Sequence, residues 1–91
     1  MKVLRYSTQY KKDFKRYRNN PVKLIKLLEV LRLLEAEAEL PARYRLHALV
    51  GDYKGCFECH IEGDSLLIWM DGSSNIIDLL RLGSHSELFG K

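Results

Sequence analysis

The sequence predicts an α+β fold in which an N-terminal helical hairpin packs on a small antiparallel β-sheet. Residues 7–38 carry apolar side chains at the three- and four-residue spacing of helices. After Pro41 the apolar residues alternate or form short runs, which is the pattern of strands. Helices followed by hairpin-connected strands are typical of this layered architecture. With 91 residues and no linker, we expect a single domain over residues 1–91.

The first helix is preceded by a short β-prone segment. Residues 3–6 predict a brief first strand, and Ser7 or Thr8 is the expected N-cap of the helix that follows. The aromatic residues of this helix recur at helical spacing, and we expect the stripe they form to lie in the core. The stripe consists of Tyr10, Phe14 and Tyr17.

The second helix has a clear start and stop. Asn20 suits the N-cap and Pro21 suits the first helical position, where a missing N–H costs nothing. The helical pattern runs to about Ala38, and Pro41 marks the stop. Its apolar face is broad, so we expect it to be the more buried of the two helices. This face contains Val22, Leu24, Ile25, Leu27, Leu28, Val30, Leu31, Leu33 and Leu34.

The remaining elements predict an antiparallel meander. Residues 44–49 form a short strand or an extended loop. Between Gly55 and Glu62 an apolar face alternates with a polar one, as expected of a sheet that covers helices and leaves its second face open. Residues 66–70 are apolar on both faces and fit a central strand, and residues 76–82 predict a third strand. Residues 86–89 form a brief tail or a single helical turn.

Basic residues are concentrated in the N-terminal third. The formal net charge is +3, but residues 1–32 carry +8 and residues 33–91 carry −5. This imbalance indicates either an anionic partner such as nucleic acid, with Lys11 and Lys15 contacting phosphate, or a solvated helix surface. No apolar run approaches the roughly 20 residues of a membrane span. The N-terminus also lacks the apolar region of a signal peptide, so we expect a cytoplasmic protein without membrane contact.

The run CFECH, from Cys56 to His60, matches the attachment pattern of c-type haem. In an alternating strand, however, the side chains of Cys56 and Cys59 point to opposite faces. This geometry disfavours haem attachment, a redox disulfide, and a zinc site completed by His47 or His85. We therefore expect neither a metal nor a cofactor.

His60, Asp64 and His85 form a more coherent set for chemistry. Unperturbed histidine titrates at about pH 6.5, so one histidine can act as a base and another as an acid at neutral pH. Metal-independent RNA cleavage needs such a pair and a cation that stabilises the phosphorane. The accompanying candidates are Arg81 or Lys54 as the cation and Phe89 as a surface on which a base stacks. The alternative is that the histidines are ordinary surface residues and Asp64 is only a turn residue.

Two stretches resemble the YafQ-like branch of the RelE/ParE toxin superfamily. They are LPARYRLHALVGDYKGCFECHIEGDSLLIWM and LLRLGSHSELFG. The resemblance implies a RelE-like fold and a bacterial toxin that enters the ribosomal A site and cuts mRNA without a metal. The functional positions of the family fall on residues that this chain retains, namely His47, His60, Asp64, His85 and Phe89.

The resemblance also implies roles and partners. His85 is the expected general acid, and Asp64 or His60 is expected to assist the nucleophile. The implied partners are a DinJ/RelB-type antitoxin, the ribosome and mRNA. The expected RNA or phosphate contacts are Arg81, Lys54, Arg45, Lys11 and Lys15.

The chain departs from the family pattern at three positions. Phe57 stands where arginine is common, Leu46 where an acidic or amide residue is usual, and Ser65 where an aromatic residue is frequent. The loss of a cation at Phe57 leaves open a degenerate toxin that binds its partners but cuts poorly. A second alternative is a non-enzymatic, ParE-like gyrase poison, which has no need of the histidine–aspartate set.

Overall fold

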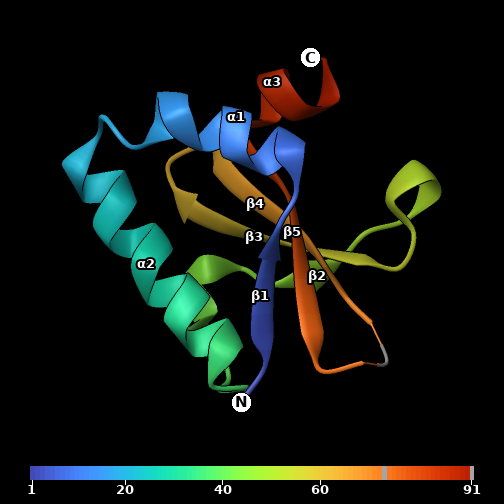
Figure 1. The fold of residues 1–91 in the computed structure, drawn as a ribbon. Coiled ribbons are helices and arrows are strands. Elements are labelled where there is room, and N and C mark those ends of the chain that lie inside the picture. Colours follow the sequence, from blue (N-terminus) through green and yellow to red (C-terminus); the bar gives the residue numbers. More distant parts are fainter. Residues whose placement is uncertain (73, 91) are drawn as a thin grey trace.

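The structure, a computed structural model, describes residues 1–72 and 74–90. Its centre is a five-stranded sheet in the order β1-β5-β4-β3-β2 (Figure 1). As predicted, successive strands of the C-terminal half pair antiparallel and β4 is central. The strands are β1 (Val3–Tyr6), β2 (His47–Ala48), β3 (Cys56–Glu62), β4 (Ser65–Asp71) and β5 (Ile76–Ser84).

The sheet is mixed, which corrects the prediction of a wholly antiparallel sheet. β1 pairs in parallel with β5, in the register Val3 to Ile76 through Tyr6 to Leu79. Parallel pairing requires a long crossover, and the two helices that follow β1 supply it. They return the chain to the end of the sheet where β1 begins, so that the Lys2 N–H donates to the Glu35 carbonyl at 2.9 Å (Figure 1).

The two long helices start at the predicted caps. α1 (Thr8–Tyr17) is capped by Ser7, whose Oγ accepts from the Tyr10 N–H at 3.0 Å. α2 (Pro21–Glu35) is capped by Asn20, whose Oδ1 accepts from the Lys23 N–H at 3.1 Å. α2 ends three residues before the predicted Ala38. There the chain reverses through Glu37, which adopts a left-handed φ of 59°. Neither these nor any other helix of residues 1–72 and 74–90 has the length and apolarity to cross a bilayer.

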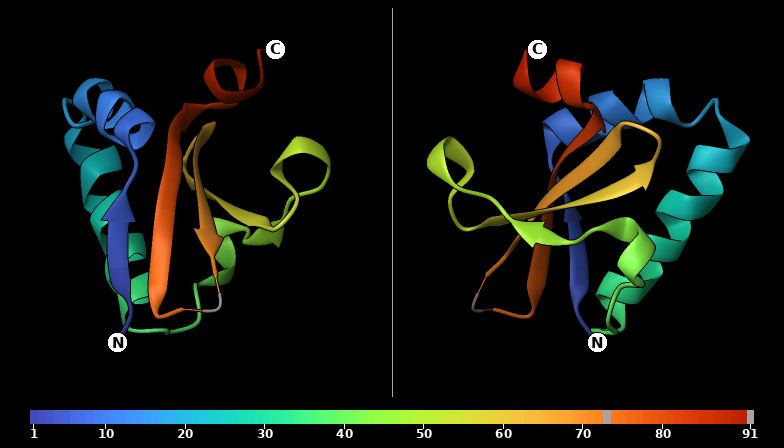
Figure 2. Two further views of the ribbon diagram at one scale, coloured as in Figure 1. Left: turned by 45° about the vertical axis from the view of Figure 1, so that its right-hand side comes forward. Right: turned by 180° about the vertical axis from the view of Figure 1, so that it is seen from behind.

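The main core lies between one face of the sheet and both helices (Figure 2). The predicted aromatic stripe of α1 packs here, with Tyr10 and Tyr17 buried and Phe14 partly buried. The prediction that α2 is the more buried helix is confirmed, because five of its 15 residues are exposed compared with six of the ten residues of α1. Its broad apolar face is nevertheless buried only in part. Only one side of α2 meets the sheet, through Leu27, Val30 and Leu31. The other side leaves Val22, Ile25 and Leu28 exposed by 54%, 68% and 46%.

The second face of the sheet is covered rather than open, as Figure 2 shows. A short 3-10 helix (Gly51–Tyr53) and α3 (His85–Phe89) pack over it and build a second apolar cluster. The prediction failed because these segments are too short to show a periodic pattern. The cluster contains Cys56, Leu66, Ile68 and Leu88, with Leu49, Tyr53, Leu80 and Phe89 packed at its margin.

A buried carboxylate, Asp13, joins α1 to the edge of β5. β1 stops at Tyr6 opposite Leu79, so the next part of this edge has no neighbouring strand in the sheet. Asp13 is 1% exposed and takes that place: its Oδ2 accepts from the Leu82 N–H and from Arg81 Nε, both at 2.9 Å. Burial alone would raise the pKa of the Asp13 carboxyl. The hydrogen bonds from Arg81, Leu82 and Gln9 outweigh this and lower the pKa below its ordinary value.

Phe57 belongs to the helix side of the sheet. Its ring stacks on Trp69, with centroids 6.1 Å apart, and packs against the main core. Neighbouring residues of β3 alternate in direction, so Glu58 and His60 point to the other face. An arginine at position 57 would therefore point away from the histidines, and Phe57 does not remove a cation from beside them.

The Asp13→Asn variant keeps the shape of the side chain and removes its charge. Because the native pKa lies below the reference value of 3.8, the stabilisation by Asp13 is present above that pH and is lost as pH falls through the native pKa. We expect a loss of about 3–5 kcal/mol in unfolding free energy at pH 7. The difference from wild type should shrink as the pH falls below 3.8 toward the native pKa. Urea unfolding at pH 7 and over the acid range measures it. Asp52→Asn, at an exposed loop acid, is the matched control. Equal losses in both variants would contradict the account.

Introducing the arginine common in similar toxins, Phe57→Arg, should destabilise the protein without raising its activity. The change places a charge against Trp69 and the main core, and we expect a loss of about 1–3 kcal/mol in unfolding free energy. Thermal unfolding tests the expectation, with Phe57→Leu as the uncharged control. A Phe57→Arg variant of wild-type stability and sharply increased RNA cleavage would show that the side chain reaches the histidines.

Candidate active site

Two of the predicted histidines, His47 and His60, lie beside one buried glutamate, Glu58. His47 in β2 pairs with Glu58 in β3, and its Nε2 lies 2.8 Å from Glu58 Oε2. Its Nδ1 lies 3.0 Å from the carbonyl oxygen of Arg45, so both ring nitrogens face oxygen acceptors. His60 Nε2 lies 4.0 Å from the same Glu58 oxygen, and the two imidazole centroids are 6.2 Å apart. Glu58 therefore holds the His47 ring, and the His60 ring lies near the same carboxylate without a direct hydrogen bond.

Sequence reasoning missed Glu58. It is only 5% exposed, which is unusual for a carboxylate and calls for partners such as these two histidines. A signal was present, because Glu58 precedes His60 by two residues and so shares its face of the strand. The pairing with His47 was not visible, since it depends on the register of β2, a strand of two residues.

The third predicted histidine, His85, opens α3 and packs on aromatic rings. Its imidazole centroid is 4.9 Å from that of Phe89, one turn further along the helix. Phe89 in turn makes an edge-to-face contact with Tyr53 at 5.7 Å. Tyr53 was not predicted as part of the site. Lys54, the residue that follows it, is exposed beside this aromatic cluster.

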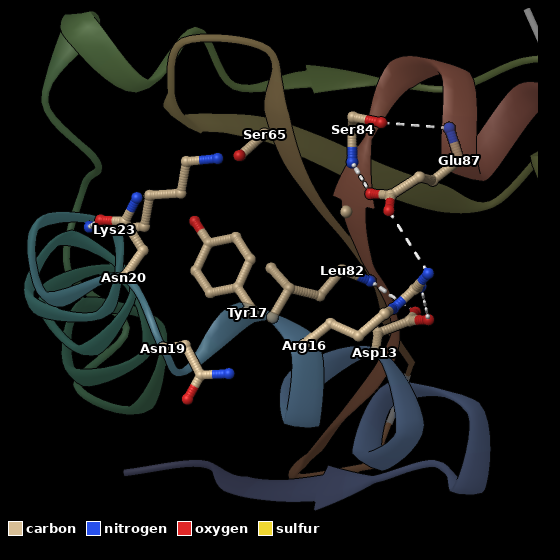
Figure 3. Close-up of a pocket in the computed structure, with 11 residues that line it drawn as sticks. Asp13, Arg16, Tyr17, Asn19, Asn20, Lys23, Ser65, Leu82, Ser84 and Glu87 are labelled. Carbon is tan, nitrogen blue, oxygen red and sulfur yellow. Dashed lines mark hydrogen bonds and ion pairs between the residues drawn. The ribbon is translucent and has the colours of Figure 1, made fainter.

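A capping box and an ion pair hold the start of α3 in place. Ser84 Oγ accepts from the Glu87 N–H at 3.1 Å, and Glu87 Oε1 accepts from the Ser84 N–H at 2.7 Å. The Ser84 N–H and nearby Arg16 lower the pKa of Glu87 below its ordinary value. Arg16 Nη1 lies 3.3 Å from Glu87 Oε2, and Arg16 Nη2 lies 3.3 Å from Asp13 Oδ1 (Figure 3). A continuous polar chain thus runs from Asp13 to the helix that carries His85.

Asp64 lies at the same end of the sheet as His85. It occupies the turn between β3 and β4, next to Gly63, whose left-handed φ is 57°. The residue after it, Ser65, pairs in register with Ser84, the residue before His85. Asp64 and His85 therefore flank one pair of neighbouring residues, and both are exposed.

His60 faces His85 across the central strand. His60 is opposite Leu66, and Leu66 is opposite Gly83, so the backbones of His60 and Gly83 are two strand spacings apart, roughly 10 Å. Leu66 belongs to the second apolar cluster, which forms the floor between the two histidines. We call this surface, with His47, Glu58, His60 and His85, the histidine face.

The residues predicted to supply positive charge lie on different surfaces of the protein. Arg81 is bound to Asp13, so its charge is already matched. Arg45 is exposed and lines a pocket of about 270 Å³ together with His60. Lys11 and Lys15 line a separate groove between α1 and α2, on the helix side of the sheet. The structure therefore does not bring these two lysines together with the histidines.

The cysteines are separated as predicted. Cys59 is buried in the main core, and Cys56 is buried in the cluster on the other face. Burial raises the pKa of Cys59 to about 12 and also raises the pKa of Cys56, which keeps both thiols protonated and unreactive. Within the part of the chain that the structure describes, no three histidine, cysteine or carboxylate side chains are grouped to hold a metal ion.

Comparisons with known proteins give matches over nearly the whole chain. A family model described as the bacterial toxin of a type II toxin–antitoxin system, YafQ, matches residues 2–90. The mRNA interferase toxin YafQ of Escherichia coli K12 is 36% identical over 89 residues, covering 96% of this chain and 95% of that protein.

Solved structures also match over nearly the whole chain. The E. coli DinJ–YafQ complex matches with a TM-score of 0.86 and 32% identity, over 99% of this chain and 100% of that one. A metal-bound toxin from Helicobacter pylori matches with a TM-score of 0.87 and 38% identity, over 98% and 100%. The chain therefore belongs to the YafQ family of type II toxin–antitoxin toxins.

Proposed function

We propose that this protein is a ribosome-dependent mRNA endonuclease that cuts by histidine–carboxylate acid–base chemistry. The observation that carries the proposal is the histidine face, in a chain that is similar over 96% of its length to an mRNA interferase. Candidate proton donors and acceptors stand on both sides of the central strand β4, at the end that carries Asp64 and His85. A ribose–phosphate step of single-stranded RNA at this end of the sheet would meet them from two directions.

In the proposed reaction the ribose 2′-hydroxyl attacks the adjacent phosphorus. Asp64 or His60 takes the hydroxyl proton, the P–O5′ bond breaks, and His85 gives a proton to the departing 5′-oxygen. The products are a 2′,3′-cyclic phosphate and a free 5′-hydroxyl. A cation must stabilise the negative phosphorane, and Arg45 is well placed for this beside His60.

The surrounding residues support these roles by holding the groups in place. The Asp13–Arg16–Glu87 chain anchors the first turn of α3 and with it His85. Phe89, packed on Tyr53, offers a ring on which an exposed base can stack. Arg81 acts mainly by organising Asp13 and the edge of β5, and contributes less than Arg45 to binding phosphate.

We also propose a DinJ-type antitoxin as the partner, as in the E. coli YafQ complex. The groove between α1 and α2 supports this. It combines the half-exposed apolar side chains of Tyr6 and Leu28 with Lys11 and Lys15. An amphipathic, acidic segment matches such a surface in both apolarity and charge. Lys11 and Lys15 are thus assigned to the antitoxin rather than to RNA, and the histidine face to mRNA on cytoplasmic ribosomes.

Replacing His85 should abolish toxicity. Loss of a general acid typically lowers a rate by about 10²–10⁴-fold, so cells that express His85→Ala without antitoxin should grow normally. Growth after induction measures this, with immunoblotting to confirm equal protein levels. Ser86→Ala, an exposed neighbour on α3, should stay toxic. Equal growth inhibition by the wild type and His85→Ala would rule out the catalytic assignment.

Neutralising Glu58 should slow cleavage, and Glu58→Gln does so with a side chain of nearly the same size. Glu58→Gln weakens a charge-assisted contact to His47 at 2.8 Å, and such contacts contribute about 1.5–3 kcal/mol. We therefore expect a fall of about tenfold or more in kcat, measured on ribosome-bound mRNA in a translation extract. Glu39→Gln, at an exposed glutamate outside the histidine face, serves as the control. If Glu58→Gln cleaves at the wild-type rate, the Glu58–histidine contacts have no part in the reaction.

A further inference from the structure

A second pocket, of about 320 Å³, lies on the helix side of the sheet (Figure 3). It opens where the end of α1 and the start of α2 meet the ends of β4 and β5. Its volume is at the lower end of the range of small-ligand pockets, roughly 300–1,000 Å³. The mechanism above gives it no role.

The carboxylates that line this pocket are already engaged. Asp13 accepts hydrogen bonds from Arg81, Gln9, Arg16 and the Leu82 N–H. Glu87 accepts from the Ser84 N–H and pairs with Arg16. The positive charges of Arg16 and Arg81 therefore balance the negative charges of the two carboxylates. Lys23, which also lines the pocket, adds a positive charge.

The remaining polar groups at the pocket are neutral and include hydrogen-bond donors. Tyr17 is only 7% exposed, and its hydroxyl has no hydrogen-bond partner at normal distance among residues 1–72 and 74–90. The Ser65 side chain, which also lines the pocket, lies close enough to the hydroxyl to lower its pKa. Figure 3 shows this hydroxyl pointing into the pocket, toward Lys23 and Ser65. Burial raises the pKa of Tyr17, so the hydroxyl keeps its proton and can donate it. A buried hydroxyl without a partner is costly and indicates an absent ligand.

The start of α2 adds to this positive character. Asn20 caps the helix and Pro21 occupies its first turn, so the helix N-terminus opens at the pocket beside Lys23. Pro21 has no N–H, and the N–H groups of Lys23 and Leu24 already donate to Asn20. The contribution of the helix start is therefore its dipole, which favours an anion at this position. The helix has 15 residues, which is long enough for this dipole to develop.

We propose that this pocket binds a phosphate group, held by the Tyr17 hydroxyl, the Lys23 ammonium and the start of α2. The inference deepens the proposed function and rests on it in one respect: the phosphate belongs to the mRNA backbone, near the cleaved linkage. The pocket is lined by Ser65 and Ser84, the paired residues that Asp64 and His85 flank. An RNA strand that passes over His85 at this end of the sheet therefore reaches the pocket with a neighbouring phosphate.

The first test is an NMR titration of the full-length His85→Ala protein with inorganic phosphate at constant ionic strength. This background leaves RNA intact, so binding is measured whether or not the protein cleaves. We expect saturable shifts of the Val22, Lys23, Ser65 and Gly83 amides. Tyr17→Phe and Lys23→Gln should each weaken binding about tenfold, as expected for the loss of a hydrogen bond to a charged acceptor. Tyr10→Phe and Lys12→Gln, both in α1 and outside the pocket, are the matched controls. An absence of saturable shifts, or equal weakening in the controls, would overturn the site.

The second test identifies the source of the phosphate. A trinucleotide RNA should shift the same amides, and the same RNA with uncharged methylphosphonate linkages should not. Shifts with inorganic phosphate alone would overturn the assignment to RNA. In cleavage assays without the His85 change, Tyr17→Phe should raise KM by about tenfold, as loss of one charged hydrogen bond predicts. A loss confined to kcat would contradict a binding role. Failure of the proposed nuclease would instead appear as His85-independent toxicity, which this titration does not measure.

Discussion

The structure depends on one buried carboxylate, Asp13, placed where the sheet would otherwise end in unpaired backbone. Its oxygens take the place of a neighbouring strand for Leu82 and bind Arg81 at the same time. Through Arg16 the same charge reaches Glu87, which caps α3. The position of His85, the expected general acid, is therefore coupled to packing on the opposite side of the sheet. Such a fully bonded polar group specifies one arrangement more strictly than apolar contact alone would.

The sheet divides the chemistry of the protein between its two faces. Alternation in β3 sends Cys59 to the main core and Glu58 and His60 to the histidine face. The same alternation places Phe57 against Trp69, so its difference from similar toxins concerns packing rather than catalysis. The groove that we assign to the antitoxin lies between α1 and α2, on the helix side. The antitoxin would then contact the groove on the helix side, while mRNA would contact the histidine face and, through one neighbouring phosphate, the separate pocket at the start of α2.

Local patterns predicted much of the fold. The caps at Ser7 and Asn20 and the central position of β4 follow from turn residues and from periodicity within single segments. The parallel pairing of β1 with β5 and the apolar cluster under α3 were missed, because they depend on contacts between distant segments. The site divides in the same way. Histidine positions came from sequence, whereas Glu58 as the link between His47 and His60 required the register of a two-residue strand. Asp13 stood out only as one of two acids in a basic N-terminal third.

The most direct test of the account is primer extension on mRNA recovered from a translating extract that contains the purified protein. The account predicts discrete cuts, in frame with the codons and absent when translation is blocked before ribosomes engage the message. The same reaction on deproteinised mRNA should leave the message intact. Intact mRNA in the translating extract, together with DNA damage in cells, would contradict the account and point to a gyrase poison of related fold.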